Sequence, residues 1–176
     1  EKLEEAIEAY SKAISLNPNS AETYLNMGSA LQDQGRLEKA IEAYTKALSL
    51  KPDNAHAHRS LSAIKKYTVE DEHFLQVQEL YKCERLSDDK RCNFNFTLAK
   101  MYEDVGKLEQ AFSHLLAGNA LRKKLLKYSI DQDIEVFSRL RETQPHLSKN
   151  SLKIKESSIG STPIFILGMP RSGTTL

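Results

Sequence analysis

The sequence has few of the residues that punctuate or cross-link a chain. Its 176 residues include seven glycines, five prolines and two cysteines. So few glycines and prolines favour long helices over a succession of turns. Cys83 and Cys92 fit a reducing compartment better than a secreted protein held by disulfides, so we expect a cytoplasmic location. A chain of this length can bury a core without such cross-links.

The charge and the hydrophobicity of the sequence exclude two further classes of protein. The formal net charge is +1, whereas a broad nucleic-acid-binding surface carries an excess of basic residues, so we expect no nucleic-acid partner. No apolar run approaches the roughly 18 residues of a transmembrane helix, so no membrane span is expected.

The chain starts at Glu1 inside a helical pattern and stops at Leu176 directly after a glycine-bearing motif. We therefore expect a fragment of a longer protein.

A repeat with a period of 34 residues dominates the first part of the chain. Residues 3–18 and 37–52 are identical at 12 of 16 aligned positions. This period is typical of a tetratricopeptide array, in which each unit is a pair of antiparallel helices. The spacing of Leu3, Ile7 and Ile14 predicts one apolar stripe along a helix.

The repeat predicts a helical array over residues 1–142. Residues 21–54 form a complete unit, whose first helix is predicted to start after Ser20 and to end at Gly35. Residues 89–122 form a divergent unit in which the same pattern returns. The fold class expected for this part of the chain is therefore mainly α, with the units stacked as a solenoid.

The pattern changes at the end of the helical part. The basic run Arg122 to Lys124 is interpreted as a solvated helix end that complements the helix dipole, or as a contact to an anionic ligand or an acidic face. A short helix is expected over 131–141. Residues 143–162 contain several serines, a proline and a glycine, and we predict an extended linker there.

The histidines and cysteines have no spacing typical of a metal site or a catalytic centre, and no metal is expected. His58 stands one period after Tyr24, on the stripe that is buried in the complete unit. All five histidines are therefore interpreted as surface or packing residues: His56, His58, His73, His114 and His146.

The last fourteen residues carry a different pattern. Residues 163–167 are a short apolar run, which predicts a buried strand of a parallel sheet. Two glycines, one arginine and three hydroxyl side chains follow directly in Gly168–Thr175. A strand that enters a glycine-bearing turn before a helix is the anatomy of a phosphate-binding loop, because backbone N–H groups at a helix N-terminus attract anions.

The type of anion is narrowed by two side chains. Gly168 and Gly173 have the spacing of the nucleoside-triphosphatase loop, but Thr174 replaces the lysine that contacts the terminal phosphates. This replacement weakens the magnesium-nucleotide hypothesis without removing it, and a tight turn that binds nothing is a further alternative. Arg171 adds a planar charged fork that suits phosphate or sulfonate oxygens.

Residues 163–176 resemble the 5′-phosphosulfate-binding loop of sulfotransferases, which use 3′-phosphoadenosine 5′-phosphosulfate (PAPS) as the sulfuryl donor. The resemblance is to bacterial proteins in which tetratricopeptide repeats precede a sulfotransferase domain related to the tyrosylprotein sulfotransferases. Residues 96–141 also resemble the helical region of that family. The resemblance implies an α-solenoid over 1–142, a linker over 143–162, and the first strand and phosphate-binding loop of a truncated α/β sulfotransferase domain over 163–176.

The resemblance also implies a site and an activity. The residues that would bind PAPS are Arg171, Ser172, Gly173, Thr174 and Thr175. Arg171 would also stabilise charge on the departing nucleotide, with no metal involved. The general base and the 3′-phosphate and adenine sites lie after this loop in the related enzymes, so the chain alone is expected to be inactive.

Three functions are therefore expected or kept as alternatives. The first is the N-terminal part of a sulfotransferase, which moves a sulfuryl group from PAPS to an acceptor hydroxyl and binds a protein or the acceptor through its helical array. The second is a tetratricopeptide module that binds a protein or peptide. The third is a P-loop nucleotide-binding protein. The sequence does not indicate the acceptor.

Overall fold

The computed structural model describes residues 2–150, which form eight α-helices and no strand. The helices are α1 (Lys2–Leu16), α2 (Ala21–Asp33), α3 (Leu37–Leu50), α4 (Ala55–Ile64), α5 (Glu72–Tyr81), α6 (Asp88–Asp104), α7 (Leu108–Leu126) and α8 (Ile130–Asn150). The chain divides into two compact units, residues 1–128 and 129–176. The predicted strand 163–167 and the loop Gly168–Thr175 lie outside the described residues.

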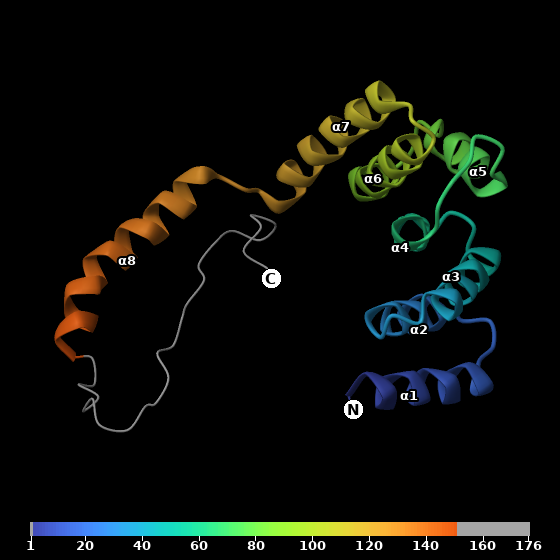
Figure 1. The fold of residues 1–176 in the computed structure, drawn as a ribbon, viewed down its shortest axis with the longest axis horizontal. Coiled ribbons are helices and arrows are strands. Elements are labelled where there is room, and N and C mark those ends of the chain that lie inside the picture. Colours follow the sequence, from blue (N-terminus) through green and yellow to red (C-terminus); the bar gives the residue numbers. More distant parts are fainter. Residues whose placement is uncertain (1, 151–176) are drawn as a thin grey trace, which may run out of the picture. The chain divides into compact units, whose positions relative to one another are not determined.

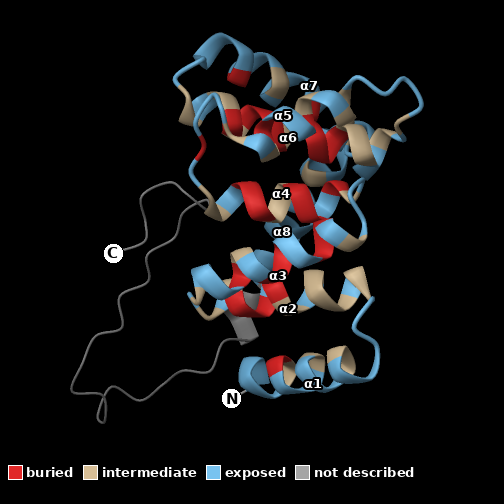
Figure 2. Ribbon diagram, turned by 90° about the vertical axis from the view of Figure 1, so that its right-hand side faces the viewer, coloured by how far each residue is buried: buried red, intermediate tan, exposed pale blue. Residues whose placement is uncertain are grey.

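Helices α1 to α4, α6 and α7 of the first unit stack in chain order, and α5 packs beside α6 (Figures 1 and 2). Helix α2 packs against α1 and α3, α4 packs against α3 and α6, and α6 packs against α7. Buried side chains form one cluster around Tyr44 and a second around Phe94. A single helix pair cannot bury its own apolar faces, so each pair depends on its neighbours for a core. The predicted helical solenoid is confirmed for this unit.

Sequence signals set the ends of the helices. Ser20 accepts a hydrogen bond from a backbone N–H of the first turn of α2, as predicted for its N-cap. Gly35 (φ +73°) and Gly106 (φ +76°) adopt the left-handed backbone region after α2 and α6. After each glycine, the next N–H donates to a carbonyl five residues earlier, at 2.9 Å. The same turn therefore closes the first helix of both units.

Gly28 allows α2 and α3 to approach closely. A Cβ atom at this position would lie 2.6 Å from the Cε1 atom of Tyr44. The Tyr44 ring is 1% exposed, and its hydroxyl donates to the side-chain oxygen of Gln32 at 2.9 Å. The ring is thus held in the space that a larger residue at position 28 would need.

We expect Gly28→Ala to lower the free energy of unfolding by about 1–3 kcal/mol, because the added methyl group collides with a buried ring. The better helix propensity of alanine, worth about 1 kcal/mol, opposes this loss in part. Urea unfolding followed by circular dichroism measures the change. Asn26→Ala, an exposed substitution in the same helix, is the control and should leave stability nearly unchanged. A Gly28→Ala protein as stable as the wild type would contradict the assigned contact.

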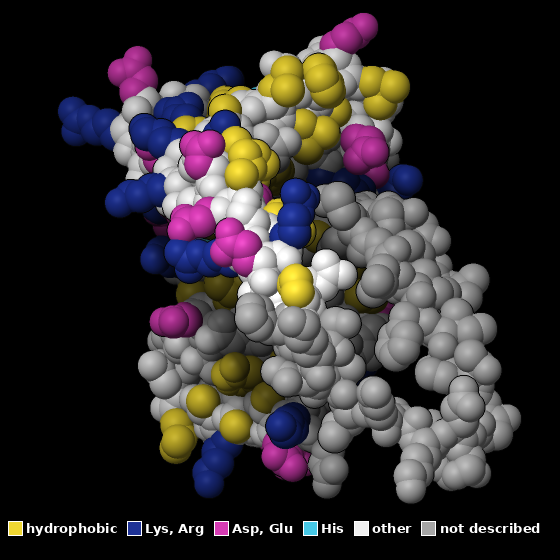
Figure 3. Space-filling model, turned by 90° about the vertical axis from the view of Figure 1, so that its left-hand side faces the viewer, with side chains coloured by type: hydrophobic (Ala, Val, Ile, Leu, Met, Phe, Trp, Pro, Cys, Tyr) yellow, Lys and Arg dark blue, Asp and Glu magenta, His cyan; other side chains and the backbone are white. Residues whose placement is uncertain are grey.

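Helix α7 presents an uncovered apolar face. Leu108, Phe112, Leu115 and Leu116 are exposed on it. The corresponding face of α3 is covered by α4, whereas no further helix of the first unit follows α7. Hydrophobic side chains gather in the upper part of Figure 3, at the end of the stack where α7 lies.

Helix α8 of the second unit is longer than the sequence pattern indicated. It ends at Asn150 instead of near residue 141 and contains Pro145. Residues 143–150, expected to begin an extended linker, are therefore helical. A proline inside a helix removes one backbone hydrogen bond and bends the helix, but the chain can continue beyond it. The rest of the predicted linker, 151–162, lies outside the described residues.

Candidate functional site

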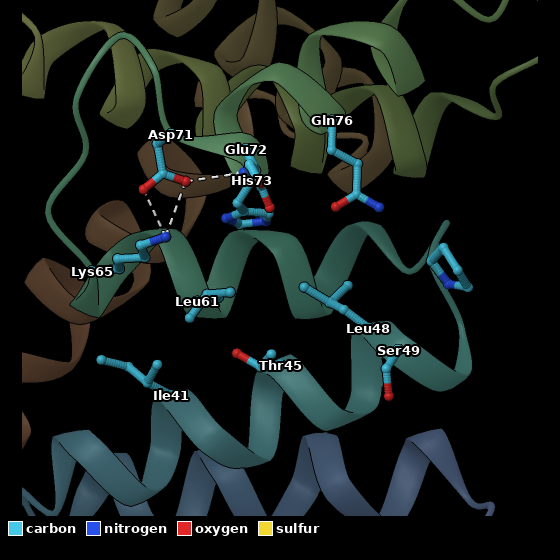
Figure 4. A pocket seen from close by; sticks show the side chains of 11 residues that line it. Ile41, Thr45, Leu48, Ser49, Leu61, Lys65, Asp71, Glu72, His73 and Gln76 are labelled. Atoms are coloured by element: carbon cyan, nitrogen blue, oxygen red, sulfur yellow. Dashed lines mark hydrogen bonds and ion pairs between the residues drawn. The ribbon is translucent and has the colours of Figure 1, made fainter.

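A groove lies over each of the helices α2, α4 and α6, which we call the floor helices. Its walls are the helices on either side, and α1, α3, α5 and α7 are called the wall helices. The groove over α4 is the largest, with a volume of about 600 Å³. Its lining residues come from α3 (Ile41, Thr45, Leu48, Ser49), from Pro52, from α4 and its cap (Leu61, Lys65), and from the start of α5 (Asp71, Glu72, His73, Gln76). Figure 4 shows α4 running between the two walls.

The groove over α2 is the same feature one repeat earlier. It has a volume of about 390 Å³ and lies between α1 and α3. Six lining positions of the two grooves are related by the 34-residue period: Ile7 and Ile41, Ser11 and Thr45, Met27 and Leu61, Leu31 and Lys65, Lys39 and His73, Glu42 and Gln76. The repeat thus builds equivalent grooves whose side chains differ.

The groove over α6 is narrower and aromatic, with a volume of about 310 Å³. His114 of α7 stacks on the ring of Tyr102 at a centroid distance of 5.4 Å and meets the edge of the Tyr81 ring at 5.3 Å. Its Nδ1 atom lies 2.9 Å from the side-chain oxygen of Asn95, which can only accept a hydrogen bond. Burial lowers the pKa of His114, so the ring is held as a neutral donor at Nδ1.

A chain of hydrogen bonds ties one end of the groove over α4 together. The Nε2 atom of His58 lies 2.8 Å from the carbonyl oxygen of Pro52, so Nε2 carries the proton and donates. The Nδ1 atom of His58 then accepts from Nε2 of His73 at 2.7 Å. His73 in turn accepts the hydroxyl proton of Tyr67 at its Nδ1 atom, at 2.8 Å. Both rings are therefore neutral, with their tautomers set by their partners.

The loop between α4 and α5 is fixed by charges as well. Lys65 and Asp71 form an ion pair at 2.7 Å across the mouth of the groove, as Figure 4 shows. The side chain of Asp104 in α6 is 5% exposed and pairs with Lys100 at 2.6 Å. Asp104 also accepts the backbone N–H of Tyr67 at 3.3 Å. The residues that connect the two helices are thus held to α6 and to each other.

Burial lowers the pKa of His58, and burial followed by the charge of His58 lowers that of His73 to about 3. The ordinary pKa of histidine, 6.5, is restored on unfolding. The unfolded chain therefore binds protons that the folded one does not. The stability due to the neutral pair is complete above pH 6.5 and is lost as the pH falls toward 3.

We expect the free energy of unfolding to fall by about 1–2 kcal/mol between pH 7 and pH 5 as a result of His73. Urea unfolding at a series of pH values measures this loss. His73→Gln should be less stable than the wild type at pH 7 but show a flatter pH profile. His56→Gln, at an exposed position of α4, should keep the wild-type profile. An unchanged profile in His73→Gln would contradict the assignment.

A second polar cluster lies on the other side of α4. The Arg59 guanidinium lies 4.5 Å from the centroid of the Phe96 ring and donates to the side-chain oxygen of Asn93 at 3.1 Å. His56 lies 3.9 Å from a carboxylate oxygen of Asp89. These contacts link α4 to α6 and already engage the arginine on this face.

The structure leaves the predicted PAPS residues untested, because Arg171, Ser172, Gly173, Thr174 and Thr175 lie outside the described residues. His58 and His73 are packing residues, as predicted, but their hydrogen bond to each other was missed. One signal pointed to His58, namely its place one period after Tyr24. Nothing in the spacing pointed to His73, since contacts across a groove depend on the tertiary fold.

The basic run at the end of α7 contacts an acidic face, which was one of the two alternatives predicted for it. Lys124 pairs with Asp88, in the acidic first turn of α6, at 2.6 Å. Both side chains are partly exposed, so the pair adds little stability.

Among residues 2–150 no cluster of three potential metal ligands is present, and no helix is long and apolar enough to cross a membrane.

Comparison with known families agrees with the helical period. Residues 1–35 match the family described as "TPR repeat", and residues 21–54 match the family described as "Tetratricopeptide repeat". Residues 1–54 contain tetratricopeptide repeats. These matches end before the described helices α4 to α8, and the sulfotransferase resemblance of residues 163–176 stays a prediction.

Two individual proteins are similar to this chain. An uncharacterized protein of Aquifex aeolicus (strain VF5) is 43% identical over 120 residues, which are 64% of this chain and 15% of that protein. The chain thus spans a small part of this relative. The crystal structure of MamA has a TM-score of 0.40 and 19% identity, over 72% of this chain and 92% of that one.

Proposed function

We propose that the helical array is a protein-docking module and that it takes a segment of a partner protein in the groove over α4. The groove itself carries this proposal. Its volume of about 600 Å³ lies within the range of about 300–1,000 Å³ typical of ligand sites. Tetratricopeptide repeats present extended surfaces that suit binding of other chains.

The lining of the groove has the two components that a peptide site needs. Ile41, Leu48 and Leu61 give it an apolar base on which an apolar side chain of the partner can be buried. Thr45, Ser49 and Gln76 add hydroxyl and amide groups at the rim, which can bond a peptide backbone. The rim therefore offers orientation, and the base offers affinity.

The groove is also held in shape before any ligand arrives. The hydrogen-bonded chain from Tyr67 through His73 and His58 to Pro52 joins the α5 wall to the α4 floor and to the connection between α3 and α4. The Lys65–Asp71 pair holds the mouth. A site that is already ordered spends less conformational entropy on binding. Arg59 on the other side of α4 is already engaged by Phe96 and Asn93, which favours the groove over that side.

Thr45→Trp tests this proposal, because an indole at this exposed position fills part of the groove over α4. Peptides are selected from a phage-displayed library on the full chain and then assayed by fluorescence anisotropy. We expect Thr45→Trp to weaken their binding by at least about tenfold.

Ser11→Trp is the matched control, since Ser11 has the equivalent place in the groove over α2. It should leave unchanged the binding of the peptides that Thr45→Trp weakens. Failure to select any peptide would contradict the proposal. So would equal binding to wild type and Thr45→Trp, and sensitivity to Arg59→Ala alone would place the site on the opposite side of α4.

We further propose that the array belongs to a PAPS-dependent sulfotransferase, in which Gly168–Thr175 binds the 5′-phosphosulfate group. Support comes from the order of features at the end of the chain: an apolar run, two glycines, Arg171 and three hydroxyl side chains. Backbone N–H groups and an arginine fork are complementary to the oxygens of phosphate and sulfonate. The array would then bind a protein that carries the acceptor or controls its access. A nucleotide-binding loop is the alternative.

In the longer protein that this proposal requires, Arg171→Ala should lower the rate of sulfuryl transfer from PAPS by about 100-fold, because one charge-stabilising group is lost. Transfer of label from [³⁵S]PAPS to an acceptor measures the rate. Arg141→Ala, an exposed arginine in α8, is a control for loss of charge. Wild-type transfer by Arg171→Ala would remove the assigned role, and magnesium-dependent ATP hydrolysis would favour the nucleotide alternative.

A further inference from the structure

The equivalent grooves differ most in charge. The wall of the groove over α2 carries Lys39, Glu42 and Lys46 on α3. One period later, the same positions on the α5 wall are His73, Gln76 and Leu80. No lysine or arginine of α5 lines the groove over α4, whose wall instead has Asp71 and Glu72. The basic wall is therefore a feature of the first groove and not of the repeat.

The two lysines of this wall are free to meet a ligand. Lys39 and Lys46 are exposed, and neither side-chain ammonium group has an ion-pair or hydrogen-bond partner among the residues that the structure describes. Arg36, by contrast, lies 3.6 Å from Glu4 and donates to Gln34. The excess positive charge of the groove thus comes from the two lysines.

The lysines stand at a definite spacing. They are seven residues apart on α3, which is close to two turns, so they lie on the same side of the helix about 10 Å apart. Glu42 lies between them on that side. Below them the groove has an apolar base that includes Ile7, Tyr24 and Met27. The order across the wall is therefore cation, anion, cation, beside a surface that can bury an apolar side chain.

We propose that the groove over α2 binds an acidic segment of a partner protein, with carboxylates about 10 Å apart on the two lysines and an apolar side chain on Ile7, Tyr24 and Met27. This inference extends the proposed docking function to a second groove. It rests on that function only in the premise that the array binds other protein chains. Charge complementarity selects the partner: two unpaired cations attract carboxylates, and Glu42 repels a third carboxylate between them. In an extended polyproline-type chain, residues three apart share a face and lie about 9 Å apart, which matches the lysine spacing.

A fluorescein-labelled peptide made of four Glu-Glu-Leu triplets is the probe, because its glutamates recur at a spacing of three residues and a leucine follows each pair of glutamates. Its binding to the full chain is measured by anisotropy and compared with that of a Gln-Gln-Leu peptide of equal length. We expect saturable binding of the acidic peptide that weakens with added salt. Lys39→Gln combined with Lys46→Gln should weaken it about five- to tenfold, and Glu42→Gln should strengthen it about twofold.

A matched control separates the groove from general attraction to basic side chains. Lys123→Gln combined with Lys124→Gln removes the same charge from the end of α7 and should leave binding unchanged. Ser11→Trp should abolish binding, whereas Thr45→Trp, which tests the groove over α4, should not affect it. The two proposals can therefore fail separately.

Three results would overturn the inference. The first is the absence of saturable binding up to about 1 mM of the acidic peptide. The second is binding of the Gln-Gln-Leu peptide with equal affinity. The third is equal loss in the groove double variant and in the α7 double variant, which would mean that net charge and not the groove attracts the peptide.

Discussion

Packing of each floor helix between two neighbours is the constraint on which the rest of this structure depends. A helix pair of about 30 residues cannot bury its own apolar faces, so the core exists only between successive pairs. Gly28 is the extreme case, because its missing side chain is the space in which the Tyr44 ring lies. Once the floor helices are set between their walls at such close approach, open grooves along the stack follow from the geometry of the repeat.

The same constraint explains why a histidine can replace a tyrosine on the buried stripe. His58 stands one period after Tyr24 and is completely buried, so both ring nitrogens need partners. Pro52 and His73 supply them, and the other nitrogen of the His73 ring is in turn hydrogen-bonded to the Tyr67 hydroxyl. The divergence of the third unit from the repeat pattern is therefore compensated by a local polar network, which replaces apolar packing at this point of the array.

The repeated backbone gives the grooves the same shape, whereas the side chains that line them differ. The period places Ile7 and Ile41, and likewise Ser11 and Thr45, at equivalent points of two grooves. The exposed wall positions are not bound by the core, so they can differ without cost to packing. Glu42 in one groove and Gln76 in the next, both exposed, illustrate this freedom. Different grooves of one array can thus present different charges to different segments of a partner.

The sequence by itself determined the helical repeat, the cap at Ser20, the glycine turns after α2 and α6, and the buried stripe. Each of these depends on residues close together in the chain, whose spacing reflects helix geometry directly. It did not determine the end of α8, because a proline marks a break in a helix without requiring one.

Only the tertiary structure decided which side chains share a groove, that His58 and His73 bond each other, and that Lys39 and Lys46 remain unpaired among the described residues. The physical reason is that these contacts join residues on different helices. The distance between such residues is set by how the helices pack, which no local spacing encodes.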